Sequence, residues 1–196
     1  MIEEYLYYST FSGIMACWIV FALTFFLRKR APASGESKRD NKAFAGIFLE
    51  ACGFSLIWIF RRKGYLLAES AGTFVAAIVS LLAVTLAVAS VWLVMSAIRH
   101  LGKQWAVAAR VVEDHRLITD GPYGIVRNPI YTGMLGMLVA TGITVSHWWA
   151  LIPACALFWI GTIIRVRAEE RLLKDTFGTE FEAYAARVPS LIPGVY

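Results

Sequence analysis

The stretch that decides the fold class is residues 71–98, which read AGTFVAAIVSLLAVTLAVASVWLVMSAI. These 28 residues contain no Asp, Glu, Lys or Arg. A helix of about 20 apolar residues is enough to cross the roughly 30 Å hydrocarbon core of a bilayer. Across all 196 residues, 58% are hydrophobic and only 17% are charged, against about a quarter charged in soluble domains. The composition favours an integral, multi-pass membrane protein over a water-soluble enzyme, and it excludes a disordered, collagen-like or coiled-coil chain.

Further apolar runs complete a helical bundle. Residues 10–27 carry no charge, and residues 43–60 carry only Glu50. Residues 128–164 also lack Asp, Glu, Lys and Arg, but this run is too long for one span. Ser146-His147 near its middle predicts a tight hairpin of two helices, each about 17 residues or roughly 25 Å long. We therefore expect an all-α bundle of about five transmembrane helices that ends in a helical hairpin.

The chain divides into two regions on this pattern. Residues 1–98 hold three N-terminal transmembrane helices, and residues 99–196 hold a loop, the hairpin and an amphipathic tail. Between about residues 166 and 186, apolar side chains recur three and four positions apart, which is typical of a helix with one apolar face. We expect this tail to lie at the membrane surface or to fold back over the bundle.

The basic residues predict an orientation in the membrane. Lys and Arg gather in residues 28–42, in residues 99–127 and after residue 164. Five spans place these three segments on one side, which the positive-inside rule makes cytoplasmic. Arg61, Arg62 and Lys63 fall on the other side, against the rule. Because basic residues flank apolar runs, the net charge of +5 reflects topology, and we expect no nucleic-acid partner.

The cysteines indicate neither a metal site nor a disulfide framework. Cys17, Cys52 and Cys155 each lie inside an apolar run, and no CxxC or CxxH spacing occurs. A free cysteine in such a position behaves as a small hydrophobic residue. We therefore predict no metal ligands in this chain.

Polar residues concentrate in residues 115–131 and 165–171, on either side of the hairpin. A tight turn at the far end brings both segments to the same cytoplasmic mouth, which defines a candidate cofactor pocket. Arg165 and Glu169 are four residues apart and share a helix face, so they form either a surface salt bridge or a site for an anionic substrate and a cationic partner. The first segment is either a well-capped loop or a binding site, and Glu50 is either an ion site or a lone carboxylate facing the bundle interior.

Together the two segments resemble the isoprenylcysteine carboxyl methyltransferase family of small membrane enzymes that use S-adenosylmethionine. The resemblance covers about residues 99–193, so this region looks methyltransferase-like. It rests on the order and spacing of short motifs, which here read His115-Arg116-Leu117-Ile118, Gly121-Pro122-Tyr123, Arg127-Asn128-Pro129-Ile130-Tyr131, Arg165 with Glu169-Glu170, Phe177-Gly178, Tyr184 and Val188-Pro189. Asn128 stands where the family usually has His, and Ala108 stands where its eukaryotic members use Gln.

The resemblance implies a specific reaction and site. The methyl group of S-adenosylmethionine would pass to a lipophilic acceptor, such as the carboxylate of an isoprenylcysteine-like or prenylated substrate, leaving S-adenosylhomocysteine. Arg165 would face the substrate carboxylate, and membrane lipids would surround the enzyme. The residues implied for cofactor binding are His115, Arg116, Leu117, Ile118, Tyr123, Asn128, Pro129, Ile130, Tyr131 and Glu169.

The residue types suit this chemistry. A sulfonium cation is held by carboxylates and aromatic faces, and a carboxylate acceptor is already ionised at neutral pH, so no general base is needed. Three alternatives stay open. They are a phospholipid N- or S-methyltransferase, an NADPH-dependent oxidoreductase similar to sterol reductases, and a non-catalytic membrane protein in which Glu50 is the functional point.

Overall fold

The computed structural model describes residues 2–27, 42–62, 72–102 and 116–194, most of which are helical. The helices are α1 (Ile2–Phe26), α2 (Lys42–Ile59), α3 (Thr73–Leu101), the 3₁₀ turn η3 (Gly121–Gly124), α4 (Pro129–Val145), α5 (Trp148–Phe177) and α6 (Thr179–Ala185). The described residues form no strand beyond an isolated bridge between Arg61 and Ser146. Helices satisfy their own backbone hydrogen bonds, as apolar surroundings require. The all-α prediction is confirmed.

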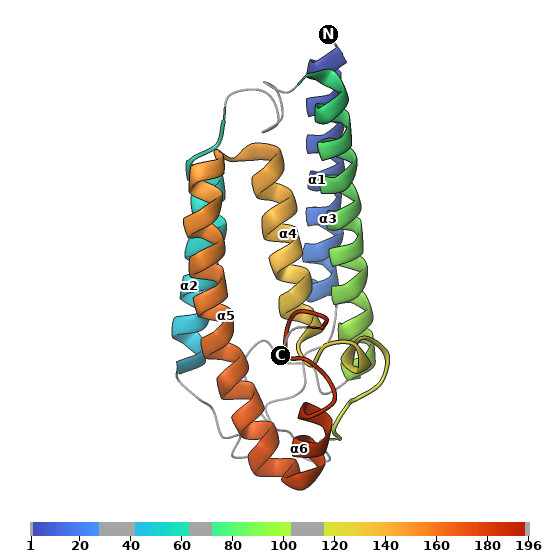
Figure 1. Ribbon diagram of the computed structural model, residues 1–196, viewed down its shortest axis with the longest axis vertical. Helices are drawn as coiled ribbons and strands as arrows, with labels where there is room; N and C mark the ends of the chain where they lie inside the picture. Colours follow the sequence, from blue (N-terminus) through green and yellow to red (C-terminus); the bar gives the residue numbers. More distant parts are fainter. Residues whose placement is uncertain (1, 28–41, 63–71, 103–115, 195–196) are drawn as a thin grey trace.

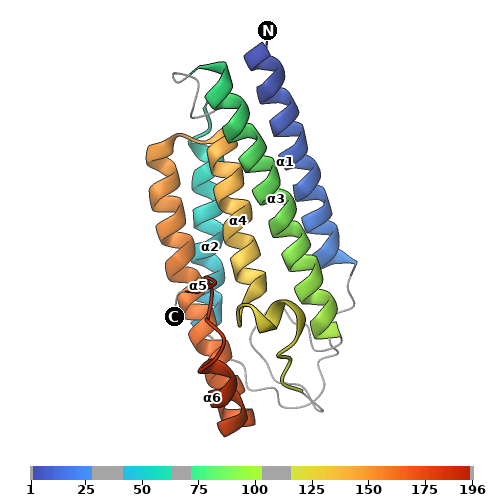
Figure 2. The same ribbon diagram turned by 45° about the vertical axis from the view of Figure 1, so that its right-hand side comes forward.

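Five long helices run roughly parallel along the length of the molecule (Figure 1). α2 packs along α5, and α1 packs along α3, with α4 lying between these two pairs (Figure 2). Two apolar cores result. Ile14, Val94 and Met137 belong to the core between α1, α3 and α4, whereas Leu138 and Phe158 belong to the core between α2, α4 and α5. α4 is therefore buried on both sides.

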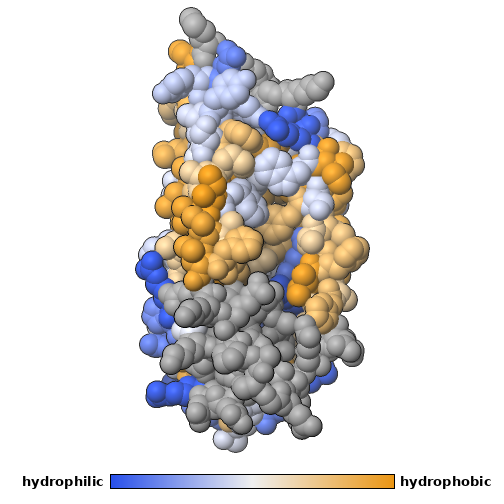
Figure 3. Space-filling model, turned by 180° about the vertical axis from the view of Figure 1, so that it is seen from behind, coloured by the Kyte–Doolittle hydropathy of each residue, from blue (hydrophilic) through white to orange (hydrophobic). Residues whose placement is uncertain are grey.

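The outer surface of the bundle is apolar. α1 from Glu4, α3 and α5 are each long and apolar enough to cross a membrane, and α2 and α4 are shorter apolar helices within the same bundle. Large hydrophobic side chains such as Phe48, Leu81 and Trp92 are exposed, and apolar residues cover much of the middle of the face shown in Figure 3. Soluble monomers rarely expose so large an apolar area. The chain is an integral membrane protein.

The predicted hairpin is present, and it explains one of the basic residues that break the positive-inside pattern, Arg62. α4 ends at Val145 and α5 begins at Trp148. Next to this turn, the Arg62 backbone N–H donates to the Val145 carbonyl at 2.9 Å and its Nη2 donates to the Ile143 carbonyl at 3.1 Å. A cation is favourable at the negative C-terminal end of a helix, so Arg62 caps α4. Lys63 lies outside the described residues.

The predicted helical character of residues 166–186 is confirmed, but most of this stretch continues the last span. α5 runs on to Phe177, because neither Gly nor Pro occurs between Gly161 and Gly178, and the φ of 51° at Gly178 ends the helix. Only α6 then folds back toward the bundle (Figure 1).

Candidate active site

The two polar segments meet at the end of the bundle opposite the hairpin turn (Figure 1). Tyr131, in the first turn of α4, is buried, and its hydroxyl donates a hydrogen bond to Glu169 Oε1 on α5. This contact joins residues from the loop side and the exit side of the hairpin. The two polar segments therefore come together at one place, as a shared site requires.

Arg165 contacts the same tyrosine from above its ring. The guanidinium carbon lies 4.7 Å from the centroid of the Tyr131 ring, which is a cation–π distance. One turn further along α5, Glu169 accepts the hydrogen bond from the Tyr131 hydroxyl. The predicted common face of Arg165 and Glu169 is confirmed, and Tyr131 is the residue that this face contacts.

Glu50 is the ion-pair partner of Arg165. Arg165 Nη1 lies 2.6 Å from Glu50 Oε2, and the Thr162 hydroxyl donates to Glu50 Oε1 at 3.1 Å. Glu50 is 3% exposed and Arg165 is 8% exposed. The idea of a lone carboxylate at position 50 is wrong, since the carboxylate is paired and hydrogen-bonded. The sequence marked Glu50 in one way only, as the single charged residue among residues 43–60.

Two glycines make this ion pair possible. A Cβ on Gly161 would lie 2.6 Å from the Gly46 carbonyl oxygen, and a Cβ on Gly46 would lie 2.4 Å from Arg165 Cγ. No other residue type fits these positions without moving α2 away from α5. The close approach of the two helices brings Glu50 next to Arg165.

Glu170 belongs to a second network on a different side of α5. Arg127 binds it through two nitrogens, with Nε to Oε1 at 2.9 Å and Nη2 to Oε2 at 3.3 Å. Asn128 Nδ2 donates to the same Oε1 at 3.0 Å, and the Ser190 hydroxyl donates to it at 3.3 Å. Bidentate arginine–carboxylate contacts of this kind are strong and directional. Sequence reasoning attached no role to Arg127, Glu170 or Ser190.

The same network fastens the end of the chain to the start of α4. The backbone N–H groups of Arg127 and Asn128 donate to the carbonyls of Pro189 and Ser190 at 2.8 and 3.0 Å. The Thr132 hydroxyl donates to the Leu191 carbonyl at 2.6 Å. Leu191 is buried in a small core with Tyr131 and Val166. Residues 186–191 therefore form the tail clamp, which covers Tyr131. Asn128, predicted to bind the cofactor, uses its amide within this clamp.

Tyr123 and Tyr184 form a buried support beneath the site. The Tyr184 hydroxyl donates to the Tyr123 carbonyl at 2.6 Å. Burial raises the pKa of the Tyr123 hydroxyl, and the Glu169 carboxylate raises it further. Burial also raises the pKa of Tyr184 to about 12. Both phenols are neutral at physiological pH, and Tyr123 lies within the electrostatic reach of Glu169.

The other predicted cofactor residues are distributed around this cluster. His115 lies outside the described residues. Arg116 is exposed, and Leu117 and Ile118 are half-buried in the segment that leads to η3. Pro129 is buried at the start of α4, whereas Ile130 packs against the core of α1, α3 and α4.

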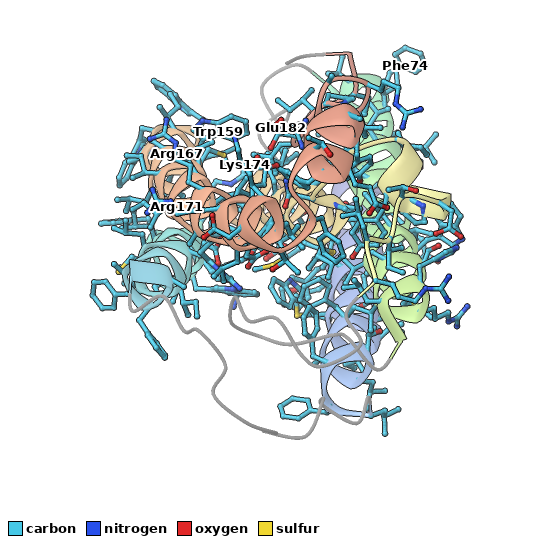
Figure 4. The ribbon with its side chains drawn as sticks, turned by 90° about the horizontal axis from the view of Figure 1, so that it is seen from below. Phe74, Trp159, Arg167, Arg171, Lys174 and Glu182 are labelled. Atoms are coloured by element: carbon cyan, nitrogen blue, oxygen red, sulfur yellow. The ribbon has the colours of Figure 1, made fainter. Side chains whose placement is uncertain are left out.

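Charged side chains surround the outer end of α5. Lys174 and Glu182 point toward one another and form an ion pair of 2.7 Å between α5 and α6 (Figure 4). Arg167 and Arg171 lie on the outer side of α5, away from α6, and both are exposed (Figure 4). The site thus lies at a polar end of an apolar bundle.

Comparison with known proteins identifies the family of the chain. The model of the phospholipid methyltransferase family matches residues 78–180. The chain is 36% identical over 89 residues to protein-S-isoprenylcysteine O-methyltransferase B of Arabidopsis thaliana, covering 45% of each protein. It is 33% identical over 87 residues to the protein-S-isoprenylcysteine O-methyltransferase of Schizosaccharomyces pombe, covering 44% of this chain and 37% of that protein.

A relative with a different name also matches. The chain is 32% identical over 95 residues to the cobalt-zinc-cadmium resistance protein CzcN of Cupriavidus metallidurans, covering 47% of this chain and 43% of that protein. In each of these three comparisons the chain spans less than half the length of the relative. The family match itself extends over more than half of this chain and includes Tyr131, Arg165 and Glu169. The chain belongs to the phospholipid methyltransferase family, and a stretch of 87 to 89 residues is similar to two protein-S-isoprenylcysteine O-methyltransferases.

Proposed function

We propose that this protein is a membrane methyltransferase that uses S-adenosylmethionine and methylates the carboxylate of a lipophilic, isoprenylcysteine-like acceptor. The observation that carries the proposal is the contact of Tyr131 with both Glu169 and Arg165 at one end of an apolar bundle. A carboxylate, a guanidinium and an aromatic ring are the groups that a cationic cofactor and an anionic acceptor require. The relatives named as isoprenylcysteine methyltransferases support the choice of acceptor.

The residues present fit the cofactor. Glu169 offers a carboxylate for its cationic groups, Tyr131 offers an aromatic ring whose hydroxyl contacts Glu169, and Tyr123 offers a second buried ring in η3. His115 and residues 116–118 would line it partly through their backbone, with Pro129 and Ile130 completing the wall and Asn128 holding the tail clamp over it. When bound, S-adenosylmethionine supplies a methyl carbon whose bond to sulfur breaks, leaving the electron pair on sulfur, as the bond to the acceptor oxygen forms.

Arg165 would hold the acceptor. An acceptor carboxylate is ionised at neutral pH, so this chain's residues need only bind it, orient it and exclude water. Alignment of two reactants can lower a barrier by roughly 7–11 kcal/mol. Arg165 provides the cation, and the tail clamp shields Tyr131 beneath it. The apolar outer surface of the bundle would let a lipid tail approach from the bilayer.

The site end of the bundle would face the cytoplasm. α1 and α3 end, and α2 begins, at this end of the bundle (Figure 1), and the sequence that follows α1 and α3 is rich in Lys and Arg, as in cytoplasmic loops. Arg167 and Arg171 are exposed there. The cofactor would then be taken from the cytoplasm, and the acceptor from the inner leaflet.

A second candidate function is methylation of a phospholipid amine. The description of the matching family favours it. An amine acceptor must lose a proton before it can accept a methyl group, and Arg165, paired with Glu50, would then have no acceptor carboxylate to bind.

The experiment that separates these functions is transfer of a labelled methyl group by the purified protein to membrane lipids and to prenylated cysteine compounds. We expect label in a methyl ester, which alkali releases as methanol. Alkali-stable label in an amine headgroup would support the second candidate. Calorimetry that shows NADPH binding, without binding of S-adenosylmethionine or S-adenosylhomocysteine, would contradict both and favour a reductase.

The division of roles within the site has its own test. Glu169→Gln should weaken S-adenosylhomocysteine binding about ten-fold, because it removes the negative charge that would bind the ammonium group of the ligand. Arg165→Lys keeps a charge for Glu50 but loses the planar guanidinium. It should leave S-adenosylhomocysteine affinity within about two-fold and lower turnover of a carboxylate acceptor at least about ten-fold. Equal loss of binding in both variants would contradict the assignment.

A further inference from the structure

We propose that Glu50 is the counter-ion of Arg165, and that the pair keeps the polar cluster at a net charge of −1, so that the site prefers a cationic methyl donor to its uncharged-sulfur product. The proposal rests on the methyltransferase function above and adds to it a residue outside the segment that carries the family motifs. The polar cluster is defined as Glu50, Tyr131, Arg165 and Glu169.

The geometry shows that Glu50 is committed to Arg165. Both side chains are almost fully buried, and their charged atoms are 2.6 Å apart. The second carboxylate oxygen of Glu50 accepts the Thr162 hydroxyl at 3.1 Å, so both oxygens have partners. A charge buried without a partner is very unfavourable, which explains why α2 brings a carboxylate to this point of α5. Gly46 and Gly161 allow the close approach.

With both carboxylates and the guanidinium ionised, the polar cluster carries a net charge of −1. Glu50 and Glu169 contribute two negative charges, and Arg165 contributes one positive charge. Glu170 does not enter the count, because Arg127 neutralises it in the separate network. The Arg165 guanidinium lies over the ring of Tyr131, and the hydroxyl of this ring reaches Glu169. Arg165 would therefore offset the Glu169 charge if Glu50 did not offset Arg165.

This charge balance matters because donor and product differ mainly in the charge on sulfur. S-adenosylmethionine carries a sulfonium cation, S-adenosylhomocysteine carries a neutral thioether, and the other ionised groups of the two molecules are the same. A unit charge roughly 10 Å from a cation changes its affinity about ten-fold at an effective dielectric constant of about 20. The ratio of the two affinities therefore reports the net charge of the polar cluster, and it is insensitive to a general loss of packing.

The experiment is calorimetric titration of the detergent-solubilised full chain with each of the two ligands. Glu50→Gln should lower the preference for S-adenosylmethionine over S-adenosylhomocysteine about ten-fold. Glu50→Asp keeps the charge and should preserve the wild-type ratio. Thr162→Val removes the hydrogen bond from an uncharged hydroxyl to Glu50, and it should also preserve the wild-type affinity ratio. Equal weakening of both ligands by Glu50→Gln, or an unchanged ratio, would overturn the proposal.

A double variant keeps the test valid if Glu50→Gln alone loses its fold, because that change leaves Arg165 buried without its counter-ion. Glu50→Gln combined with Arg165→Gln removes one charge of each sign, so the net charge stays at −1 and the ratio should stay within about two-fold of wild type. A ratio that rises about ten-fold in the double variant would mean that Glu50 does not offset Arg165. Wild-type protein that binds neither ligand would instead refute the proposed methyltransferase function.

Discussion

At the residue scale, two adjacent carboxylates on α5 enter separate networks. Glu169 accepts the Tyr131 hydroxyl, whereas Glu170 binds Arg127 and Asn128. Consecutive residues of a helix point about 100° apart, so neighbours in sequence face different partners. Glu169 thus faces the polar cluster, and Glu170 fastens the tail clamp. The pair divides one helix surface between the polar cluster and the tail clamp.

The hydroxyl of Tyr131 gives the first prediction. Tyr131→Phe keeps the ring under Arg165 but removes the donor to Glu169. A hydrogen bond to a charged group contributes about 1.5–3 kcal/mol, and without it Glu169 is no longer held in place, so cofactor affinity should fall by up to about ten-fold. Calorimetry with S-adenosylhomocysteine measures this. Tyr131→Leu, which also removes the ring, should bind S-adenosylhomocysteine more weakly still. Equal affinities of Tyr131→Phe and wild type would contradict the role of the hydroxyl.

At the element scale, α5 connects every part of the site. Its middle packs against α2, and its outer end carries Glu169 and Glu170 and turns into α6. If α5 ended near residue 164, the two carboxylates would lie on a separate surface helix and not on the helix that packs against α2. Continuity of α5 fixes the distance between the ion pair in the bundle and the tail clamp outside it.

The contact between α2 and α5 gives the second prediction. Gly161→Ala places a Cβ against the backbone of Gly46 and should destabilise the protein by about 1–3 kcal/mol. The matched control is Gly13→Ala on α1, where a Cβ would have ordinary contacts of 3.5 Å with Val84. That change should be neutral or slightly stabilising. Thermal unfolding in detergent measures both, and equal effects would show that the α2–α5 contact is not tight.

The tail clamp gives the third prediction. Glu170→Gln weakens the bidentate contact with Arg127 and should destabilise the protein by roughly 1.5–3 kcal/mol. Tryptic cleavage after the exposed Arg187 should become faster, since the clamp no longer holds the following residues. Glu182→Gln breaks only the exposed ion pair with Lys174 and should leave the cleavage rate unchanged. A tail equally resistant in both variants would show that Glu170 does not hold it.

At the scale of the whole molecule, the two ends of the bundle differ in chemistry. One end holds the hairpin turn, with Arg62 capping α4. The other holds the polar cluster, the tail clamp and the exposed arginines of α5 (Figure 4). Between them the outer surface is apolar. This polarity along one axis is what a membrane enzyme needs to meet a water-soluble cofactor at one face of the bilayer.

Orientation gives the fourth prediction. In a chain with Cys17, Cys52 and Cys155 replaced by Ala, Glu180→Cys on α6 should react with an impermeant maleimide only in inverted membrane vesicles. Tyr5→Cys, near the opposite end of the bundle, should react only in right-side-out vesicles (Figure 1). Both residues are exposed, so access to the reagent decides the result. The reverse pattern would place the site outside the cytoplasm.

The sequence by itself determined the apolar helices, the hairpin turn at Ser146-His147 and the common face of Arg165 and Glu169. These depend on periodicity, length and turn residues within a short stretch of chain, which are local properties. Only the tertiary structure decided that Arg165 pairs with Glu50, 115 residues away, and that Asn128 serves the tail clamp. Such contacts depend on how closely two helices approach, and here the absence of a Cβ at Gly46 and Gly161 allows α2 and α5 to lie close together.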